Sequence, residues 1–206
     1  MKRAELVGDI DELRGKREEL GLRQQDFAQN PADAYAVLWS AAGGFGDPLE
    51  RDPAKVQADI DNGDVSEKTA LEVYGVVPGD ARATERRRTE LRARRIHGFP
   101  GSVERLAGKV RFLATESLAV HDNLHYGCAK CATDLGPISR NYKERCVRND
   151  LPVEASNPIV GDPKRFIDPR PQFRQFCCPG CGLLIENEIA IESDPPLKDV
   201  EILFAS

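Results

Sequence analysis

Two short cysteine pairs in the second half of the chain constrain its fold more than any other feature. They are CAKC at residues 128–131 and CPGC at residues 178–181. In a C-x-x-C pair a tight turn directs both thiolates at one ion about 2.3 Å away, so two pairs complete the tetrahedral ligand set of a zinc site. The sequence therefore predicts a structural Zn²⁺ held by Cys128, Cys131, Cys178 and Cys181.

The two knuckles (residues 128–132 and 178–182) differ in one flanking residue. Gly182 follows the second pair, where the absence of a Cβ lets the chain turn out again, whereas Ala132 takes that place in the first. The spacer from Cys131 to Cys178 exceeds the roughly 15–20 residues of a usual zinc ribbon. We therefore expect an insertion between the two knuckles.

Other uses of these cysteines stay open. Cys177 is adjacent to Cys178 and could replace it, and His125 lies three residues before Cys128 and could join an alternative ligand set. Disulfides, a redox role or an iron–sulfur cluster are further alternatives. Cys146 and Cys177 are most simply interpreted as free, buried thiols. A site with four thiolates has no open coordination position, so it would stabilise structure rather than activate water.

Composition limits the remaining classes. The chain has 206 residues and a formal net charge of −5, with a mean hydropathy of −0.46. This length and a thin core suggest two small modules or a subunit that completes its core against a partner. An acidic chain is a poor nucleic-acid binder as a whole. The absence of a signal-like or membrane-spanning apolar run predicts a cytoplasmic protein.

Helix signals fill the cysteine-free first half. Asp52 and Pro53 form an N-cap and first helical residue, followed by Val56 and Ile60 on one face. Ser66 caps a second predicted helix, which ends at Gly75. The apolar face of that second helix is predicted to hold Ala70, Leu71 and Tyr74. A third helix is predicted to begin at Asp80 or Thr84 and to end at Gly98.

The third predicted helix is strongly basic. It carries seven arginines between residues 82 and 95, interspersed with Glu85 and Glu90. A solvated face with internal ion pairs is the simplest interpretation. Docking on an acidic partner surface and binding to nucleic acid are the alternatives.

Strand signals dominate the second half. KVRFLA (109–114) and LLIENEIAIE (183–192) are apolar-rich or alternating runs flanked by glycine or proline. Residues 147–172 contain many prolines and are predicted to form a long extended connection. We therefore predict an α+β protein with a helical module over residues 1–107 and a β-rich zinc-ribbon module over residues 108–206.

Residues 41–53, AAGGFGDPLERDP, resemble a phosphate-binding loop at first sight. The stretch lacks the lysine and the Ser/Thr of a phosphate loop, and the chain turns at Pro48 before any helix begins. We interpret residues 43–48 as a backbone turn that allows close packing, with the lining of a partner's active site as the alternative. The chain also lacks G-x-S-x-G and H-E-x-x-H, so the sequence supports no catalytic residue.

Two stretches carry family resemblances. GGFGDPLERDPAKVQADIDNGDVSEKTALEVYGVV (43–77) resembles the carboxyl-terminal end of hydantoinase B and oxoprolinase-type subunits, in which the same turn, G-D-P-x-x-R-D-P motif and two helices occur in this order. The two knuckles and FRQFCCPGCGLLIENEIAIESDPP (173–196) resemble the small zinc-containing gamma subunit of acetone carboxylase.

Together the resemblances imply a non-catalytic structural subunit of an ATP-dependent ketone carboxylase (ligase) complex of the acetone or acetophenone type. They imply a hetero-oligomer with large hydantoinase-A-like and hydantoinase-B-like subunits, which would bind ATP and Mg²⁺ or Mn²⁺ and carry catalysis. The alternative is a free-standing zinc-ribbon regulator that binds nucleic acid through the arginines of residues 82–95.

Overall fold

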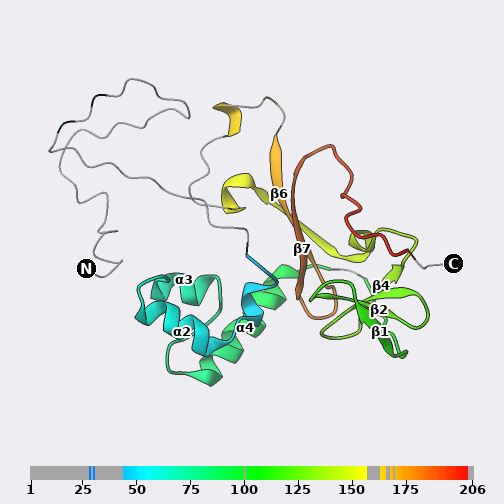
Figure 1. Cartoon of the computed structure of the whole chain (residues 1–206), viewed down its shortest axis with the longest axis horizontal. Helices are drawn as coiled ribbons and strands as arrows, with labels where there is room; N and C mark the ends of the chain where they lie inside the picture. Colours follow the sequence, from blue (N-terminus) through cyan, green and yellow to red (C-terminus); the bar gives the residue numbers. More distant parts are fainter. Residues whose placement is uncertain are drawn as a thin grey trace.

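The computed structural model describes residues 44–99, 101–156, 163–165 and 170–203, together with Ala28, Asn30 and Asp168. A small helical module precedes two antiparallel sheets, which share one core beside the cysteine pairs (Figure 1). The predicted α+β class with a β-rich carboxyl-terminal module is confirmed. Among the described residues, no helix is long and apolar enough to cross a membrane.

Three helices form the first module: α2 (Pro53–Asp61), α3 (Glu67–Glu72) and α4 (Ala81–Arg95). Each begins at the predicted cap, because the side chains of Asp52, Ser66 and Asp80 accept hydrogen bonds from backbone N–H groups of the first turn. These caps satisfy donors that would otherwise have no partner at a helix start.

The module has a small apolar core. Val56, Ala70 and Val76 are almost fully buried, and Ile60 and Tyr74 pack against them. The prediction that Leu71 belongs to the buried face is wrong, because its exposed fraction is 40%. Helix α3 is only six residues long, and Ala70 is its one buried residue. The adjacent Leu71 therefore lies on the exposed side of the helix.

The first sheet holds β1 (Val110–Leu113), β2 (Leu118–His121), β3 (His125–Cys128) and β4 (Asp134–Pro137) in chain order. Strand β1 lies within the predicted run 109–114. Strand β2 is buried along its whole length, whereas all four residues of β1 are exposed at the sheet edge. The β3–β4 hairpin carries the first knuckle at its tip.

The second sheet holds β5 (Val147–Pro152), β6 (Pro171–Cys177) and β7 (Leu184–Ile191). The β6–β7 hairpin carries the second knuckle. The prediction of an extended connection over residues 147–172 is wrong for 147–152, which pair with β6 from Val147↔Cys177 to Pro152↔Gln172. Half-buried and exposed residues alternate along β5, as expected for a strand. The strand was not predicted because this alternation lies within a run of charged and polar residues.

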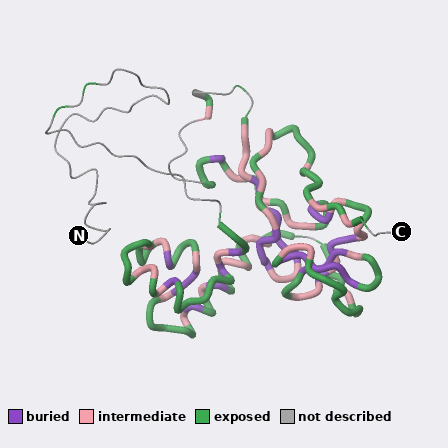
Figure 2. Tube along the Cα trace, in the orientation of Figure 1, coloured by how far each residue is buried: buried purple, intermediate pink, exposed green. Residues whose placement is uncertain are grey.

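Buried charges hold the carboxyl-terminal segment to the second sheet. Lys143 Nζ lies 2.9 Å from Glu188 Oε2 and 3.0 Å from Asp199 Oδ2. Fully buried Arg174 contacts Glu188 Oε1 at 3.1 Å and donates to the carbonyl of Ile191 at 2.7 Å. Figure 2 shows buried residues concentrated where the two sheets meet, with the helical module more exposed. The predicted zinc-ribbon core therefore includes a paired ionic cluster.

Candidate metal centre

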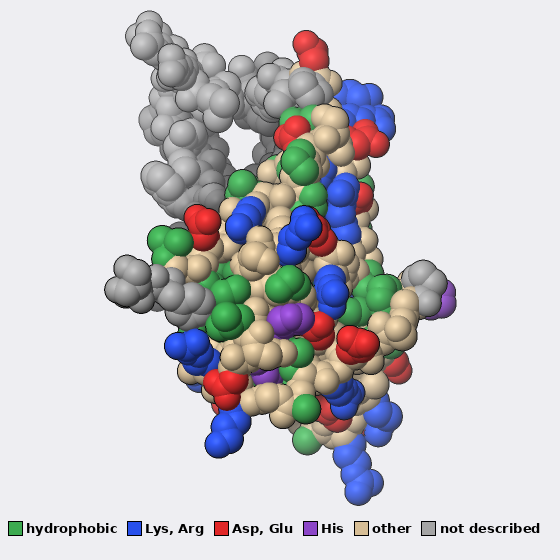
Figure 3. All heavy atoms as spheres, turned by 90° about the vertical axis from the view of Figure 1, so that its right-hand side faces the viewer, with side chains coloured by type: hydrophobic (Ala, Val, Ile, Leu, Met, Phe, Trp, Pro, Cys, Tyr) green, Lys and Arg blue, Asp and Glu red, His purple; other side chains and the backbone are tan. Residues whose placement is uncertain are grey.

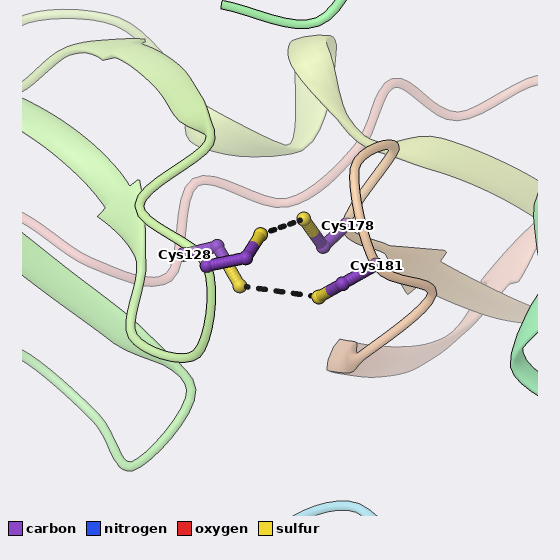
Figure 4. Close-up of side chains that lie close together, drawn as sticks. Cys128, Cys178 and Cys181 are labelled. Carbon is purple, nitrogen blue, oxygen red and sulfur yellow. Dashed lines mark hydrogen bonds between the residues drawn. The ribbon is translucent and has the colours of Figure 1, made fainter. Parts of the chain in front are cut away.

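The four predicted cysteines meet where the two hairpin tips face one another (Figure 4). Their sulfur atoms all lie within 4.8 Å of one another. The Sγ atoms of Cys128 and Cys181 are 3.7 Å apart, and those of Cys131 and Cys178 are 3.6 Å apart. A tetrahedron with zinc–sulfur bonds of about 2.3 Å has edges of roughly 3.8 Å. The sulfurs are therefore spaced as one tetrahedral ion requires.

The two knuckles have the same backbone structure. The N–H of Ala132 donates to Cys128 O, and the N–H of Gly182 donates to Cys178 O, each at 2.9 Å. The expected irregularity of the first knuckle is confined to its residue type, because Ala132 has φ 57° and Gly182 has φ 69°. Alanine in this left-handed region is strained by roughly 1–2 kcal/mol. The first knuckle therefore adopts the same turn as the second despite the backbone strain at Ala132.

The second knuckle keeps its glycine for a further reason. A Cβ on Gly182 would lie 2.4 Å from the carbonyl oxygen of Arg92 in α4. Ala132 carries a Cβ at the equivalent position, so the φ angle alone does not require glycine. Helix α4 therefore rests directly on the second knuckle through a contact that only glycine permits.

The two knuckles also pack closely against each other. A Cβ on Gly180 would lie 2.2 Å from Thr133 Oγ1, so the second knuckle packs closely on the residue that follows the first. Thr133 is buried, and its Oγ1 lies 3.0 Å from Cys131 Sγ. This hydroxyl can donate to a thiolate and orient it, as outer partners of metal ligands do.

The thiols interact electrostatically. Hydrogen bonds from the other three thiols lower the pKa of Cys131, and hydrogen bonding to Cys128 lowers the pKa of Cys178 to about 7. Cys128 and Cys178 are buried members of the core shared by both sheets. A divalent cation would bind all four sulfurs as thiolates. With four protein ligands the centre has no open position for a substrate, which suits a structural role.

The alternative ligands lie elsewhere. Cys177 is buried, accepts a hydrogen bond from Asn149 Nδ2 at 3.8 Å, and has its pKa raised to about 11, chiefly by burial. Cys146 is partly buried, and burial raises its pKa as well. Both are free thiols; Cys177 is also buried, as predicted, whereas Cys146 is only partly buried. His125 Nδ1 pairs with Asp134 Oδ1 at 2.9 Å, and among the described residues neither His125 nor Cys177 belongs to the sulfur cluster.

A buried aspartate joins the glycine-rich turn to the second knuckle. The side chain of Asp47 is fully buried and forms a two-pronged ion pair with Arg95 of α4, at 2.6 and 3.0 Å. Its oxygens also accept from the backbone N–H of Leu49 at 2.9 Å and of Leu184 at 3.0 Å. Burial raises the pKa of Asp47, but Arg95 and these N–H groups outweigh it and lower the pKa overall.

A second contact reaches the first knuckle. Glu50 Oε1 lies 2.6 Å from Arg92 NH2 of α4 and also pairs with Lys130, which lies between the two cysteines of CAKC. The Asp47 turn (residues 44–50) therefore contacts the first knuckle, α4 and the start of β7 just after the second knuckle. The interpretation of this stretch as a close-packing turn agrees with these contacts, but sequence reasoning missed the functional residue, Asp47. Gly43 lies outside the described residues.

The arginines of α4 divide into two faces. Arg88 is only 8% exposed and donates from Nε to Tyr74 O at 3.1 Å. Arg92 donates to Leu49 O at 3.2 Å, and Arg95 to Gly182 O at 3.0 Å. The solvated-face interpretation is therefore wrong for these three residues. Because α4 has almost no apolar side chains, its packed face must be polar, and the spacing 88, 92, 95 marks that face.

Comparisons with known proteins find two similarities, both to subunits of acetone carboxylase. Residues 113–205, which include both knuckles and both sheets except part of β1, match the family model of the acetone carboxylase gamma subunit. A stretch of 45 residues, 22% of the chain, is 51% identical to the acetone carboxylase alpha subunit of Xanthobacter autotrophicus. This match spans 6% of that relative.

Proposed function

We propose that this chain is a structural, assembly subunit of a multi-subunit ATP-dependent ketone carboxylase of the acetone or acetophenone type. The observation that carries the proposal is the gamma-subunit family match over residues 113–205, which contain the whole cysteine cluster. In this account, large hydantoinase-A-like and hydantoinase-B-like subunits bind ATP and Mg²⁺ or Mn²⁺ and perform the chemistry.

In this proposal the cysteine cluster stabilises the fold of the second module. Zn²⁺ bound by Cys128, Cys131, Cys178 and Cys181 would join the two hairpin tips, which lie about fifty residues apart in the chain. The segment between the knuckles folds into β4, β5 and β6, so the four sulfurs come together only in the folded module. Binding free energy at the site would therefore appear as folding free energy of the second module.

The helical module supports an assembly role. Its resemblance to the carboxyl-terminal end of hydantoinase-B-type subunits suggests a segment that packs on such a subunit body. The second resemblance to an acetone carboxylase subunit, the 45-residue match to an alpha subunit, agrees with origin in the same kind of assembly. Hydrogen bonds from Arg95 to Gly182 O and from the N–H of Leu184 to Asp47 join the helical module to the second knuckle and the start of β7.

The nucleic-acid alternative has less support. Four of the seven arginines in α4 are engaged with Asp47 or with backbone carbonyls inside the molecule. Figure 3 shows acidic and basic side chains interspersed on the face at the right of Figure 1, the side formed by the sheets. On α4 itself, Glu85 and Glu90 interrupt the arginines, whereas nucleic-acid binding requires a continuous basic surface for phosphates.

The test is isolation of the tagged chain at native expression level, followed by mass identification of its partners. We expect two large subunits, and ATP- and bicarbonate-dependent carboxylation of a ketone by the isolated complex. A complex rebuilt without the chain should lose assembly, whereas isolated large subunits that assemble and turn over normally would contradict the structural role. A wild-type chain that carries no large partner would refute the proposal.

A further inference from the structure

A hollow lies where the helical module meets the second sheet. It has a volume of about 300 Å³ and lies between α3, α4, β5 and β6. Its apolar lining includes Val73, Leu91 and Leu151, and Val73 is 46% exposed. The neighbouring Leu71 is 40% exposed. Exposed apolar side chains grouped around a hollow at a module boundary are typical of interaction surfaces.

The rim of this hollow carries charges of both signs, and arginines continue from it along α4. Arg94 lines it, and Arg86 and Arg82 continue along the outer face of α4 at helical spacing. All three are exposed, and none forms an ion pair within the part of the chain that the structure describes. Of the nearby acids, Glu90 is engaged by Arg87 at 3.5 Å, and Glu72 lies on the rim itself. The outer face of α4 therefore has more arginines than glutamates, and it lies beside an apolar floor.

We propose that this hollow and the arginines beside it are the docking surface for an acidic segment with apolar side chains on one of the larger subunits. The inference rests on the proposed function and specifies which face of the chain meets its partner. Apolar side chains of that segment would fill the hollow, and its carboxylates would pair with Arg94 and Arg86. Arginine pairs well with carboxylates because its planar fork can donate two parallel hydrogen bonds.

Both parts of the surface are needed for a stable contact. A standard interface covers roughly 800 Å² on each partner, which exceeds what a hollow of this size presents. The contact must therefore extend from the hollow along α4, where the free arginines lie. Arginine is among the residues that most often carry binding energy at interfaces, where the partner desolvates it in a well-packed pocket.

A protein segment fits this surface better than nucleic acid does. The free arginines alternate with Glu85 and Glu90, which would repel phosphates but tolerate a protein partner with mixed charge. The apolar floor would gain nothing from a phosphate backbone. Salt-sensitive binding of a DNA or RNA duplex by the isolated chain, lost on Arg94→Glu, would overturn the inference.

The test compares two charge reversals in the tagged chain within its native complex. Arg94→Glu changes the rim, and Arg140→Glu changes an exposed arginine in the turn after β4 as a matched control. We expect Arg94→Glu to weaken binding of the large subunits roughly ten-fold, with the loss largest at low salt, and Arg140→Glu to leave it unchanged. Equal recovery of the large subunits with both variants would overturn the docking surface.

A second measurement does not depend on any variant. Hydrogen exchange of residues 71–76 and 91–95 is compared between the isolated chain and the complex, with exposed strand β1 as the reference surface. We expect slower exchange in the complex at both segments. Recovery of the large subunits without this protection overturns the docking surface alone, whereas a wild-type chain that binds no large subunit overturns the proposed function as well.

Discussion

Replacement of Asp47 by alanine is the sharpest test of how the helical module is joined to the cysteine centre. Asp47 is an N-cap in an Asp-Pro pair, and so is Asp52 five residues later. The side chain of Asp47 is fully buried and pairs with Arg95, whose side chain is 17% exposed. Asp52 is exposed and satisfies only the N–H of Ala54. Asp47 and Asp52 therefore both cap a helix, but only Asp47 is buried and paired with an arginine.

The expected magnitudes follow from that difference. Loss of an exposed cap costs about 1 kcal/mol of unfolding free energy, so we expect this value for Asp52→Ala. Removal of one partner from a buried ion pair costs about 3–5 kcal/mol, because the remaining charge is left uncompensated. Water reaches part of Arg95, so we expect about 3 kcal/mol for Asp47→Ala. The N–H of Leu184 also loses its acceptor.

The assay is urea unfolding of the zinc-loaded full-length chain at neutral pH. Asp47→Asn should fall between the wild type and Asp47→Ala, because an amide oxygen can still accept from Leu49 or Leu184. The folded pKa of Asp47 is lowered from 3.8, so its contribution is present above pH 3.8 and is lost as the pH falls through the folded pKa. An Asp47→Ala variant no less stable than Asp52→Ala would refute the role of Asp47 in joining the helical module to β7.

Three further substitutions test the knuckles and the ionic cluster, all by the same unfolding measurement. Ala132→Gly should stabilise the chain by about 1 kcal/mol, because it relieves a left-handed alanine. Gly182→Ala should destabilise the chain by more than Ala132→Gly stabilises it, because the new Cβ meets Arg92 O. Effects of equal size and opposite sign would show that the positive φ accounts for both, with no contribution from the contact with α4. Lys143→Met should cost about 3 kcal/mol, the low end for a broken buried ion pair, because Glu188 keeps Arg174 as a partner. A neutral result would show that Arg174 alone compensates the charge of Glu188.

The local elements were predictable because their signals lie close together in sequence. Asp52, Ser66 and Asp80 each stand directly before a helix and cap it. The four cysteines likewise carry their spacing in two short motifs, and two tight turns suffice to bring each pair of sulfurs together. Sequence reasoning is strongest where one or two hydrogen bonds within a few residues determine the structure.

The missed features depend on contacts across long sequence separations. The partners of Asp47 are Arg95 and the N–H of Leu184, and neither position carries a local signal that points to the other. The strand β5 is hidden by charged residues, since Arg148 and Asp150 pair with each other on its exposed face. The polar packed face of α4 was misinterpreted because an arginine-rich helix normally lies in solvent.

Metal analysis of cysteine variants tests the central claim most directly. The account predicts one zinc per chain in the native protein, and its loss from both Cys128→Ser and Cys178→Ser. Cys177→Ser and Cys146→Ser should retain the metal, because these thiols lie outside the sulfur cluster of the described residues. A native protein without zinc, or a metal retained by Cys178→Ser and lost from Cys177→Ser, would contradict the four-cysteine centre on which the fold and the proposed role depend.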